Sequence, residues 1–535
     1  MQSKEKMVEK EESYHWADLV AEKIIKEKGK KAKYVCAAGI TPSGTVHIGN
    51  FREIITVDLV CRALKDKKKK VRFIYSWDDY DRLRKVPVNM PKQDVLQKFI
   101  GKPIVDTPDT FDCHKSYAEH LEKEAEEPLP IVGISPEFFY QSKRYRACEY
   151  AEMIKYAMNR REIIREVLDK YRKEPLPKDW YPLNVFCEKC GTDNTNVLEY
   201  DGEYTVSYEC DCGFSDKIDF RKKGIVKLAW RIDWPCRQHY EKVDFEPAGK
   251  EHYAQPGGSR ITANEIYEAI YDGKHPIDLK YDFITVKGEG GKMSSSLGNV
   301  ITLKECLDVY EPEIVRYLFA GTRPNVEFAI SFDLDVIKIY EDYDKTERIY
   351  FDEETEENKK EYLKEHRIYE FSQVEKVPEK MPLQVPFRHL TNLVQVYEGD
   401  IKKVVEEYKT FIKTDTDKKK LETRALCAWN WIQKYAPEDM KFKVHEKVSE
   451  AVKKELNADQ KKAVKILAEK LKKNKYDEGS LFNEFYSICQ ELKIDNKVFF
   501  KGVYLTLIGK ERGPKLAGFI LIIGVKKVIS LLEEV

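Results

Sequence analysis

The sequence predicts an α/β fold, with a parallel sheet in the front part of the chain and an all-α region behind it. Two apolar runs flank a helical stretch within about 45 residues near the N-terminus, which indicates a βαβ unit. Strand character returns at 282–286, and beyond about residue 345 the apolar pattern is helical almost throughout. With 535 residues, the chain is long enough for roughly two to four domains.

The predicted βαβ unit begins with the apolar run 34–38, a buried strand that ends at Gly39. Thr, Pro, Ser and Gly favour a tight turn at 41–45, and the run 71–77 is the second strand. Between them, apolar residues recur at helical spacing up to about residue 65: Ile48, Phe51, Ile55 and Leu59. Ligands of parallel sheets lie at the carboxyl ends of the strands, so we expect the turn and the acidic cluster 78–81 at one site.

Residues 85–225 have the pattern of an insertion into this sheet. They contain proline-rich breaks, a helical stretch at about 145–172 and a cysteine-bearing module at 187–212. In the helical region behind, apolar stripes such as 390–408 and 421–435 indicate core packing. No heptad seam or internal repeat predicts a dimer, so we expect a monomer.

The overall charge does not indicate a nucleic-acid binder, because Lys+Arg and Asp+Glu both number 93. The basic clusters 26–33 and 67–72 could still bind phosphate, although each run alone is more often a solvated face. The charged N-terminus lacks the apolar core of a signal peptide, and the longest apolar stretch, 516–525, is about half the roughly 20 residues that a membrane span needs. Twelve cysteines without a secretory signal indicate reduced thiols, so we expect a cytoplasmic protein with no membrane partner.

The first chemical motif is the segment 45–50, Thr-Val-His-Ile-Gly-Asn, between the first strand and the helix. His47 and Asn50 are three residues apart, so they share a face near the helix N-terminus. Gly49 lets a flat ring or a phosphate approach the backbone, and the N–H groups of a helix start favour a phosphate. A histidine at a helix start is most often an ordinary surface or core residue, so this motif alone does not define a site.

The second motif is the glycine-rich segment 288–296, which carries Lys292 and three serines. A lysine on a mobile loop can close over phosphates and stabilise their charge as they leave. A flexible surface loop is the alternative if the segment is considered alone. A P-loop ATPase is not indicated, because Met293 follows Lys292 where the Walker A pattern needs Ser or Thr.

Together the two motifs resemble the HIGH and KMSKS signatures of class I aminoacyl-tRNA synthetases, in the right order along the chain. Two positions depart from the pattern: Asn50 replaces the final histidine, and Ser295 or Ser296 replaces the second lysine. Asn50 can donate a hydrogen bond but carries no charge, so the phosphate-binding role falls on Lys292.

Longer stretches of the sequence around these motifs resemble the lysyl-specific members of class I. The resemblance is carried by the blocks 38–53, 76–85, 230–235 and 245–252. Residues 509–514 are similar to the helical anticodon-binding end that these enzymes share with glutamyl enzymes. This sequence differs from the usual family sequence at Cys236 and Glu251.

The resemblance implies a lysine–tRNA ligase reaction. ATP and Mg²⁺ activate lysine to lysyl-adenylate, and lysine then passes to the 3′ end of tRNA-Lys. Such chemistry needs positioning and charge stabilisation more than a covalent nucleophile. The implied catalytic residues are His47, Asn50, Lys292, Ser294 and Ser296. The implied ATP-binding residues are Thr41, Pro42, His47, Gly49, Asn50, Lys292 and Met293.

The resemblance also implies a lysine pocket. Gly39 and Thr41 match family positions that line it, and Trp230 and His252 match positions on its far side. A lysine ammonium needs carboxylate or aromatic partners, and the chemically suitable side chains are Asp78, Asp79, Asp233 and Trp230. The sequence does not rank them, and each aspartate could equally be an ordinary helix or strand cap.

Two clusters have metal-ligand spacing. Cys187 and Cys190 with Cys210 and Cys212 can close a tetrahedral structural zinc site, although the second pair is one residue shorter than the common knuckle. Free cytosolic thiols are the alternative. Carboxylate, thiol and two imidazoles that could bind a second zinc occur within twelve residues: Asp109, Cys113, His114 and His120. The alternative there is a helix start with ordinary polar residues.

We therefore expect a Rossmann-type catalytic domain formed by 1–85 and 225–300, with a zinc-binding insertion at 86–224. A connecting domain at 301–345 and a helical anticodon-binding region at 346–535 would follow. Two other functions stay open: a glutamyl- or glutaminyl-type synthetase, and a nucleotidyltransferase that forms an adenylate without tRNA. The acidic block at 76–81 favours a cationic substrate over an anionic one, and the long helical region argues against the tRNA-free enzyme.

Overall fold

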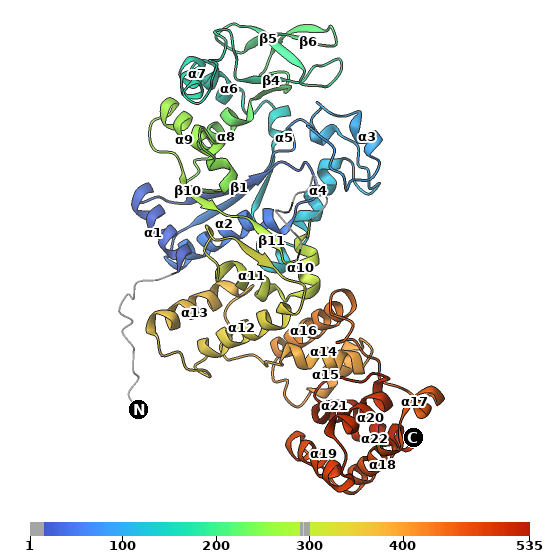
Figure 1. Ribbon diagram of the computed structural model, residues 1–535. Coiled ribbons are helices and arrows are strands. Elements are labelled where there is room, and N and C mark those ends of the chain that lie inside the picture. The colour runs from blue at the N-terminus through green and yellow to red at the C-terminus, as the bar shows by residue number, and fades with distance from the viewer. Residues whose placement is uncertain (1–14, 289–292, 294–299) are drawn as a thin grey trace, which may run out of the picture. The chain divides into compact units, whose positions relative to one another are not determined.

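The computed structural model describes residues 15–288, 293 and 300–535 (Figure 1). The chain divides into two compact units. Residues up to 306, together with 315–330 and 355–377, form the first unit, and 307–314, 331–354 and 378–535 form the second.

The first unit is built on a five-stranded parallel sheet in the order β10-β9-β1-β2-β3. Its strands are β1 (Tyr34–Ile40), β2 (Val71–Trp77), β3 (Glu137–Tyr140), β9 (Phe245–Gly249) and β10 (Ile277–Tyr281). The predicted strands at the N-terminus are confirmed as β1 and β2, which pair from Tyr34 opposite Val71 to Ile40 opposite Trp77. The first five residues of β1 are buried. Strands of a parallel sheet are covered on both faces, which explains why β1 is an apolar run without alternation.

The predicted helix between these strands is confirmed as α2 (Ile48–Asp66), which packs across β1, β2 and β9. Its apolar residues bury one side of the sheet, and α1 (Trp16–Lys28) packs against it (Figure 1). Two further helices, α8 (Trp230–Tyr240) and α9 (Ser259–Ile270), pack against each other in the segments that flank β9. The helix–strand alternation leaves the carboxyl ends of β1, β2 and β9 at one edge of the sheet.

The segment 86–224 contains short helices and small antiparallel sheets, but it also supplies β3 to the main sheet. β5, β6 and β7 form one antiparallel sheet, and β4 pairs with β8 in another. The strands are β4 (Leu183–Val185), β5 (Thr195–Tyr200), β6 (Thr205–Cys210), β7 (Ser215–Asp219) and β8 (Val226–Leu228). The helices are α3 (Gln93–Gln97), α4 (Tyr117–Glu126), α5 (Gln141–Arg146), α6 (Ala151–Met158) and α7 (Arg161–Asp169), and the 3₁₀ turns of this unit are η1 (Ile104–Asp106), η2 (Pro130–Val132) and η3 (Lys250–Tyr253).

The predicted strand at 282–286 forms, but outside the main sheet. β11 (Ile284–Val286) pairs in parallel with β12 (Phe328–Ile330) in a separate two-stranded sheet. The first unit also contains α13 (Lys359–Ser372), and its boundary with the second unit runs through α10 (Leu303–Val309) and α11 (Pro312–Ala320).

The described residues of the second unit form helices and no strands, as the helical periodicity beyond residue 345 predicts. A continuous apolar core holds α18, α19, α20, α21 and α22 together. The helices are α12 (Asp335–Tyr350), α14 (Phe387–Val396), α15 (Ile401–Glu407), α16 (Asp415–Lys434), α17 (Glu450–Glu455), α18 (Ala458–Lys473), α19 (Glu478–Leu492), α20 (Asn496–Ile508), α21 (Leu516–Ile523) and α22 (Val525–Glu533). None of the helices in the described part of the chain is long and apolar enough to cross a membrane.

Candidate active site and metal centres

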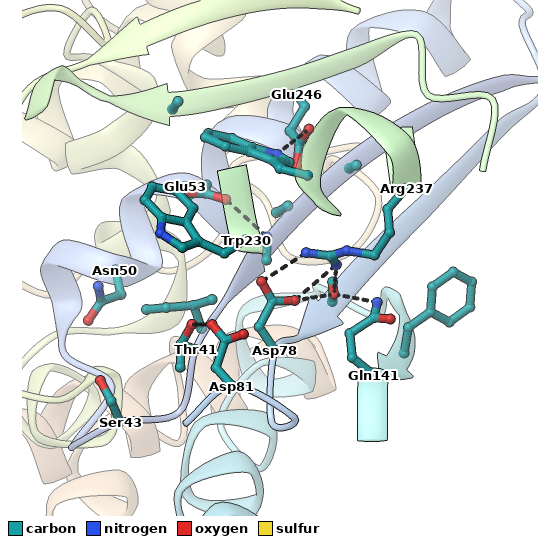
Figure 2. A pocket seen from close by; sticks show the side chains of 18 of the residues that line it. Thr41, Ser43, Asn50, Glu53, Asp78, Asp81, Gln141, Trp230, Arg237 and Glu246 are labelled. Atoms are coloured by element: carbon teal, nitrogen blue, oxygen red, sulfur yellow. Dashed lines mark hydrogen bonds and ion pairs between the residues drawn. The ribbon is translucent and has the colours of Figure 1, made fainter. Parts of the chain in front are cut away.

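A cavity of about 490 Å³ lies at the carboxyl ends of β1 and β2 (Figure 2). It is lined by the turn after β1, the acidic segment after β2, α8 and β9. This is the edge where the sequence predicts a ligand site. The predicted residues that line it are Gly39, Thr41, Asn50, Asp78, Trp230 and His252.

The turn after β1 has a close backbone approach at Gly39. A Cβ at this position would lie 2.8 Å from the carbonyl oxygen of Ser76 on the neighbouring strand, so only glycine fits. Thr41 then donates from Oγ1 to Oδ2 of Asp81 at 2.9 Å. The two contacts fix the turn against the end of β2.

His47 and Asn50 form a capping box at the N-terminus of α2. Nδ1 of His47 accepts from the backbone N–H of Gly49 at 3.1 Å, and Oδ1 of Asn50 accepts from the N–H of His47 at 3.1 Å. Asn50 lines the cavity, whereas His47 is largely buried and, like Pro42, is not among the lining residues. Asn50 therefore places the start of α2 beside the cavity, and the partial positive charge of a helix N-terminus suits an anion.

Three predicted loop residues, Lys292, Ser294 and Ser296, lie outside the described residues. Met293 between them is buried, with Cε 3.7 Å from the position that a Cβ on Gly49 would take. This methionine therefore packs at the start of α2. A side chain on Gly49 would also approach the His47 ring to 2.8 Å.

A chain of alternating charges lies under one wall of the cavity. Arg237 binds Asp78 through NH1 at 2.9 Å and Asp233 through Nε at 2.9 Å. Lys227 at the middle of β8 binds Asp233 at 3.0 Å and Asp81 at 2.9 Å. Burial lowers the pKa of Lys227, but Asp233 and Asp81 outweigh it and raise that pKa above its usual value. Asp78, Asp81 and Arg237 line the cavity, whereas Asp233 and Lys227 do not.

Two of the predicted ammonium ligands, Asp79 and Asp233, do not line the cavity. Asp79 caps α5, where its carboxylate accepts from the N–H of Ser142 at 2.7 Å and from its hydroxyl. Burial raises the pKa of Asp79 to about 6. Asp233 is fully buried and also accepts from the hydroxyl of Tyr145.

The sequence prediction missed Glu53, which lines the cavity from α2. Its carboxylate accepts from the N–H of Gly39 at 3.0 Å and from the hydroxyl of Tyr281 at 2.6 Å. Burial raises the pKa of Glu53 to about 8, although these two hydrogen bonds oppose the shift. A sequence signal does exist: this glutamate follows Asn50 by three residues, so both lie on the same helix face.

Aromatic side chains form the far wall of the cavity. Trp230, which is labelled in Figure 2, lines it together with Trp234 on the same helix α8 and with His252. The His252 ring meets Trp234 edge-on at 5.5 Å, and its Nδ1 lies 2.6 Å from the Ser259 hydroxyl. Trp234 donates from Nε1 to Glu246 at 3.1 Å.

The four cysteines of the first predicted metal cluster are brought together. Sγ of Cys187 lies 3.7 Å from Sγ of Cys212, and Sγ of Cys190 lies 3.6 Å from Sγ of Cys210. A tetrahedron with metal–sulfur bonds of about 2.3 Å has edges of ~3.8 Å, so this spacing suits one metal ion. The glycines after each pair, 191 and 213, have φ of 77° and 79°, which turns the backbone around the thiols.

The second predicted cluster also converges. Nδ1 of His114 and Nδ1 of His120 each lie 3.1 Å from Sγ of Cys113. The Asp109 carboxylate accepts from the N–H groups of Cys113 and His114, and the ligand atoms of the four residues lie within 4.8 Å of one another. Phe111 stacks on the His120 ring at 3.8 Å. Both donor sets therefore suit a metal ion.

Comparison with known proteins places the chain in a family. The sequence model of "tRNA synthetases class I (K)" matches residues 14–375, and that of "Anticodon binding domain" matches 430–535. The lysine–tRNA ligase of Borrelia garinii subsp. bavariensis is 51% identical over 522 residues, covering 96% of this chain and 99% of that protein. The lysine–tRNA ligase of Borreliella burgdorferi is 52% identical over 516 residues, covering 96% and 98%. A solved glutamate tRNA ligase from Elizabethkingia meningosepticum aligns over 94% of this chain and 98% of its own, with a TM-score of 0.43 and 14% identity. On the match to its family model and to these relatives, the chain belongs to the class I (K) tRNA synthetases.

Proposed function

We propose that the chain is a lysine–tRNA ligase, which activates lysine with ATP and transfers it to the 3′ end of tRNA-Lys. The choice of lysine as the amino acid rests on which carboxylates of the cavity are already paired with a cation. Five carboxylates line it: Glu53, Asp78, Asp81, Glu241 and Glu246. Four of them have a salt bridge to an arginine or lysine of the chain. Glu53 has none within the described residues.

Glu53 is therefore the proposed ligand of the ε-ammonium. Its raised pKa indicates a carboxylate that lacks a stabilising positive charge, and an incoming ammonium supplies one. The apolar stem of lysine would pack between this residue and the aromatic wall formed by Trp230 and Trp234. The rival substrate, glutamate, would place a second carboxylate beside Glu53, which is unfavourable.

The phosphates of ATP would lie at the N-terminus of α2. The side chains of Asn50 and His47 are the proposed donors there, and the partial positive charge of the helix N-terminus adds to them. Lys292, with Ser294 and Ser296 on the same loop, is the proposed group that follows the leaving pyrophosphate. Mg²⁺ would neutralise charge on the phosphates. The residues contribute orientation and charge, because the lysine carboxylate is itself the nucleophile.

Zinc is the proposed metal of both clusters. The first, Cys187, Cys190, Cys210 and Cys212, has only thiol donors and no open position, so its role would be structural. The second, Asp109, Cys113, His114 and His120, offers the mixed donors that zinc also accepts. Both would brace the segment 86–224.

ATP–pyrophosphate exchange with each of the twenty amino acids, with and without bulk tRNA, tests the proposal. Exchange with lysine alone is the expected result. Exchange with glutamate would keep the family and overturn the ammonium site at Glu53. No exchange under either condition would overturn the enzymatic proposal as a whole.

A further inference from the structure

The two basic runs of the sequence, 26–33 and 67–72, meet in the structure at the amino edge of the parallel sheet. The first run leads into β1 and the second into β2, and the N–H of Tyr34 donates to the carbonyl oxygen of Lys70 at 2.9 Å. In a parallel sheet all strands start at the same edge. This edge is at the opposite end of β1 and β2 from the turn and the acidic segment that line the cavity.

Two more segments join them. The N–H of Val35 donates to the Asp244 carboxylate at 2.9 Å, which places the start of β9 beside that of β1. Nζ of Lys28 donates to the carbonyl oxygens of Lys274 at 3.0 Å and His275 at 2.6 Å, which places the start of β10 in the same row. Four chain segments therefore form one continuous surface.

This surface has an excess of positive charge. Of the acidic side chains in and next to it, Asp244 binds Lys31, Glu22 binds Lys67 and Glu241 binds Arg72, whereas Glu27 and Asp272 have no salt bridge among the described residues. In the loops that lead into β1, β2, β9 and β10, seven lysines have no acidic partner among the salt bridges of the described residues, and all are exposed or half-buried: Lys30, Lys33, Lys68, Lys69, Lys70, Lys242 and Lys274. We call these seven residues the amino-edge patch.

The density of this charge matches a nucleic-acid backbone. Neighbouring strands are about 4.8 Å apart, so the row from β10 to β2 spans ~14 Å. Seven lysines less the two unpaired carboxylates give one net positive charge per ~3 Å over that length, close to the ~3.4 Å per phosphate of one nucleic-acid strand. The whole chain has zero net charge, so the patch results from where the lysines lie and not from composition.

We propose that the amino-edge patch binds the phosphate backbone of RNA without reading its sequence, as a contact separate from the active-site cavity. Lysine ammonium groups on flexible stems suit this task, because they release condensed counterions wherever a phosphate comes close. The binding would depend strongly on salt and would leave amino-acid activation unchanged.

The test measures binding of a labelled oligocytidylate RNA by fluorescence anisotropy over a series of salt concentrations. The patch variant carries Lys30→Gln, Lys33→Gln, Lys68→Gln and Lys70→Gln. The control variant carries the same change at four dispersed exposed lysines: Lys98, Lys173, Lys178 and Lys222. Both lose the same four charges, so they differ only in where the charges lay.

The expected result for the patch variant is a loss of more than tenfold in affinity at low salt. The slope of log affinity against log salt should become shallower by about 3, since each lost phosphate contact contributes roughly 0.7 on a single strand. The control variant should lose at most about threefold. Equal losses in both variants would overturn the proposal, because net charge alone would then explain the binding.

Two further measurements separate other outcomes. Vesicles with anionic lipid that bind the wild type and not the patch variant, with RNA binding equal in both, would assign the patch to a membrane surface and overturn the RNA proposal. Lysine-dependent ATP–pyrophosphate exchange should be within twofold of wild type in both variants. If the patch variant loses exchange through misfolding, the pair Lys68→Gln and Lys70→Gln carries the test, with about half the change in slope.

Discussion

Replacing Glu53 with glutamine is the sharpest test of how the cavity recognises its amino acid. Glutamine keeps the size of the side chain and can still accept from the N–H of Gly39, which lies 3.0 Å away, but it carries no charge. Leaving a buried ammonium without its carboxylate costs about 3–5 kcal/mol. We therefore expect kcat/KM for lysine in ATP–pyrophosphate exchange to fall by about 10²- to 10⁴-fold, with KM for ATP unchanged.

The pH dependence sharpens the prediction. The carboxyl group must lose its proton before it can pair with an ammonium, and burial raises its pKa to about 8. The wild-type kcat/KM for lysine should rise by about 20-fold between pH 6.5 and 8.5, and this rise should vanish in Glu53→Gln. Tyr281→Phe is the matched control, because it removes a hydrogen-bond donor from the same carboxylate and keeps the charge. It should preserve the rise with pH.

As pH rises, the stability of the substrate-free protein should fall, whereas kcat/KM for lysine should rise. Between the ordinary pKa of 4.5 and the folded value of about 8, the folded protein holds a proton at Glu53 that the unfolded chain has lost. Stability therefore falls as pH rises through this window, by at most about 5 kcal/mol and by less where cavity water solvates the carboxylate. Glu53→Gln should melt at a higher temperature than wild type at pH 8.5 and lose the stabilisation by added lysine. If the Glu53→Gln variant keeps a kcat/KM for lysine within twofold of wild type, the assignment of the ammonium site to Glu53 is refuted.

Four further predictions concern Lys292, the turn after β1, the charge chain and the two metal clusters. Lys292→Ala should lower kcat for exchange by about 10²- to 10³-fold with KM for lysine within twofold, since the proposed contact forms only as pyrophosphate leaves; an equal rise in KM would contradict this. Gly39→Ala should raise KM for lysine, because its Cβ would meet the Ser76 carbonyl oxygen at 2.8 Å and push the turn into the cavity; Gly29→Ala, where no atom lies within 4 Å, is the kinetic control. Asp233→Asn should lower the free energy of unfolding by about 3–5 kcal/mol in urea titrations, because Lys227 and Arg237 lose their shared anion, whereas Tyr145→Phe should cost no more than about 1.5 kcal/mol. Cys190→Ser should remove one equivalent of zinc in elemental analysis, and His120→Ala should remove the other; unchanged zinc content in either variant would rule out that cluster as a metal site.

The parts of the fold that the sequence predicted are those with local signals. β1, α2 and β2 have long apolar runs or clear helical spacing, so each could be recognised from its own residues. β3 and β9 were missed because they are four and five residues long, and β9 contains Pro247, which ordinarily argues against a central strand. Their place in the sheet depends on pairing with β1 and β2, which no single segment reveals.

The same limit explains which site residues could be predicted from the sequence. Asp78 and Asp79 are adjacent and chemically alike, but the first faces the cavity and the second caps α5 from below. The difference depends on Ser142, which is far along the chain and carries no motif. The two cysteine pairs were recognisable because their spacing is itself the signal, whereas a carboxylate is recognisable as a ligand only when its partners are known.

The charge chain under the cavity wall explains why the acidic segment after β2 is not left for the substrate. Three aspartates, Asp78, Asp81 and Asp233, share Lys227 and Arg237. Both cations come from segments about 150 residues further along the chain than Asp78 and Asp81, so an acidic block that looks in sequence like a cation site already has its cations. Glu53 receives only neutral donors, an N–H and a hydroxyl, and a neutral donor stabilises a carboxylate less than a full positive charge does. In the proposed lysine site, recognition of the ammonium thus depends on which internal charges are already paired, and the acidity of the neighbouring segment alone would point to Asp78 and Asp81 instead of Glu53.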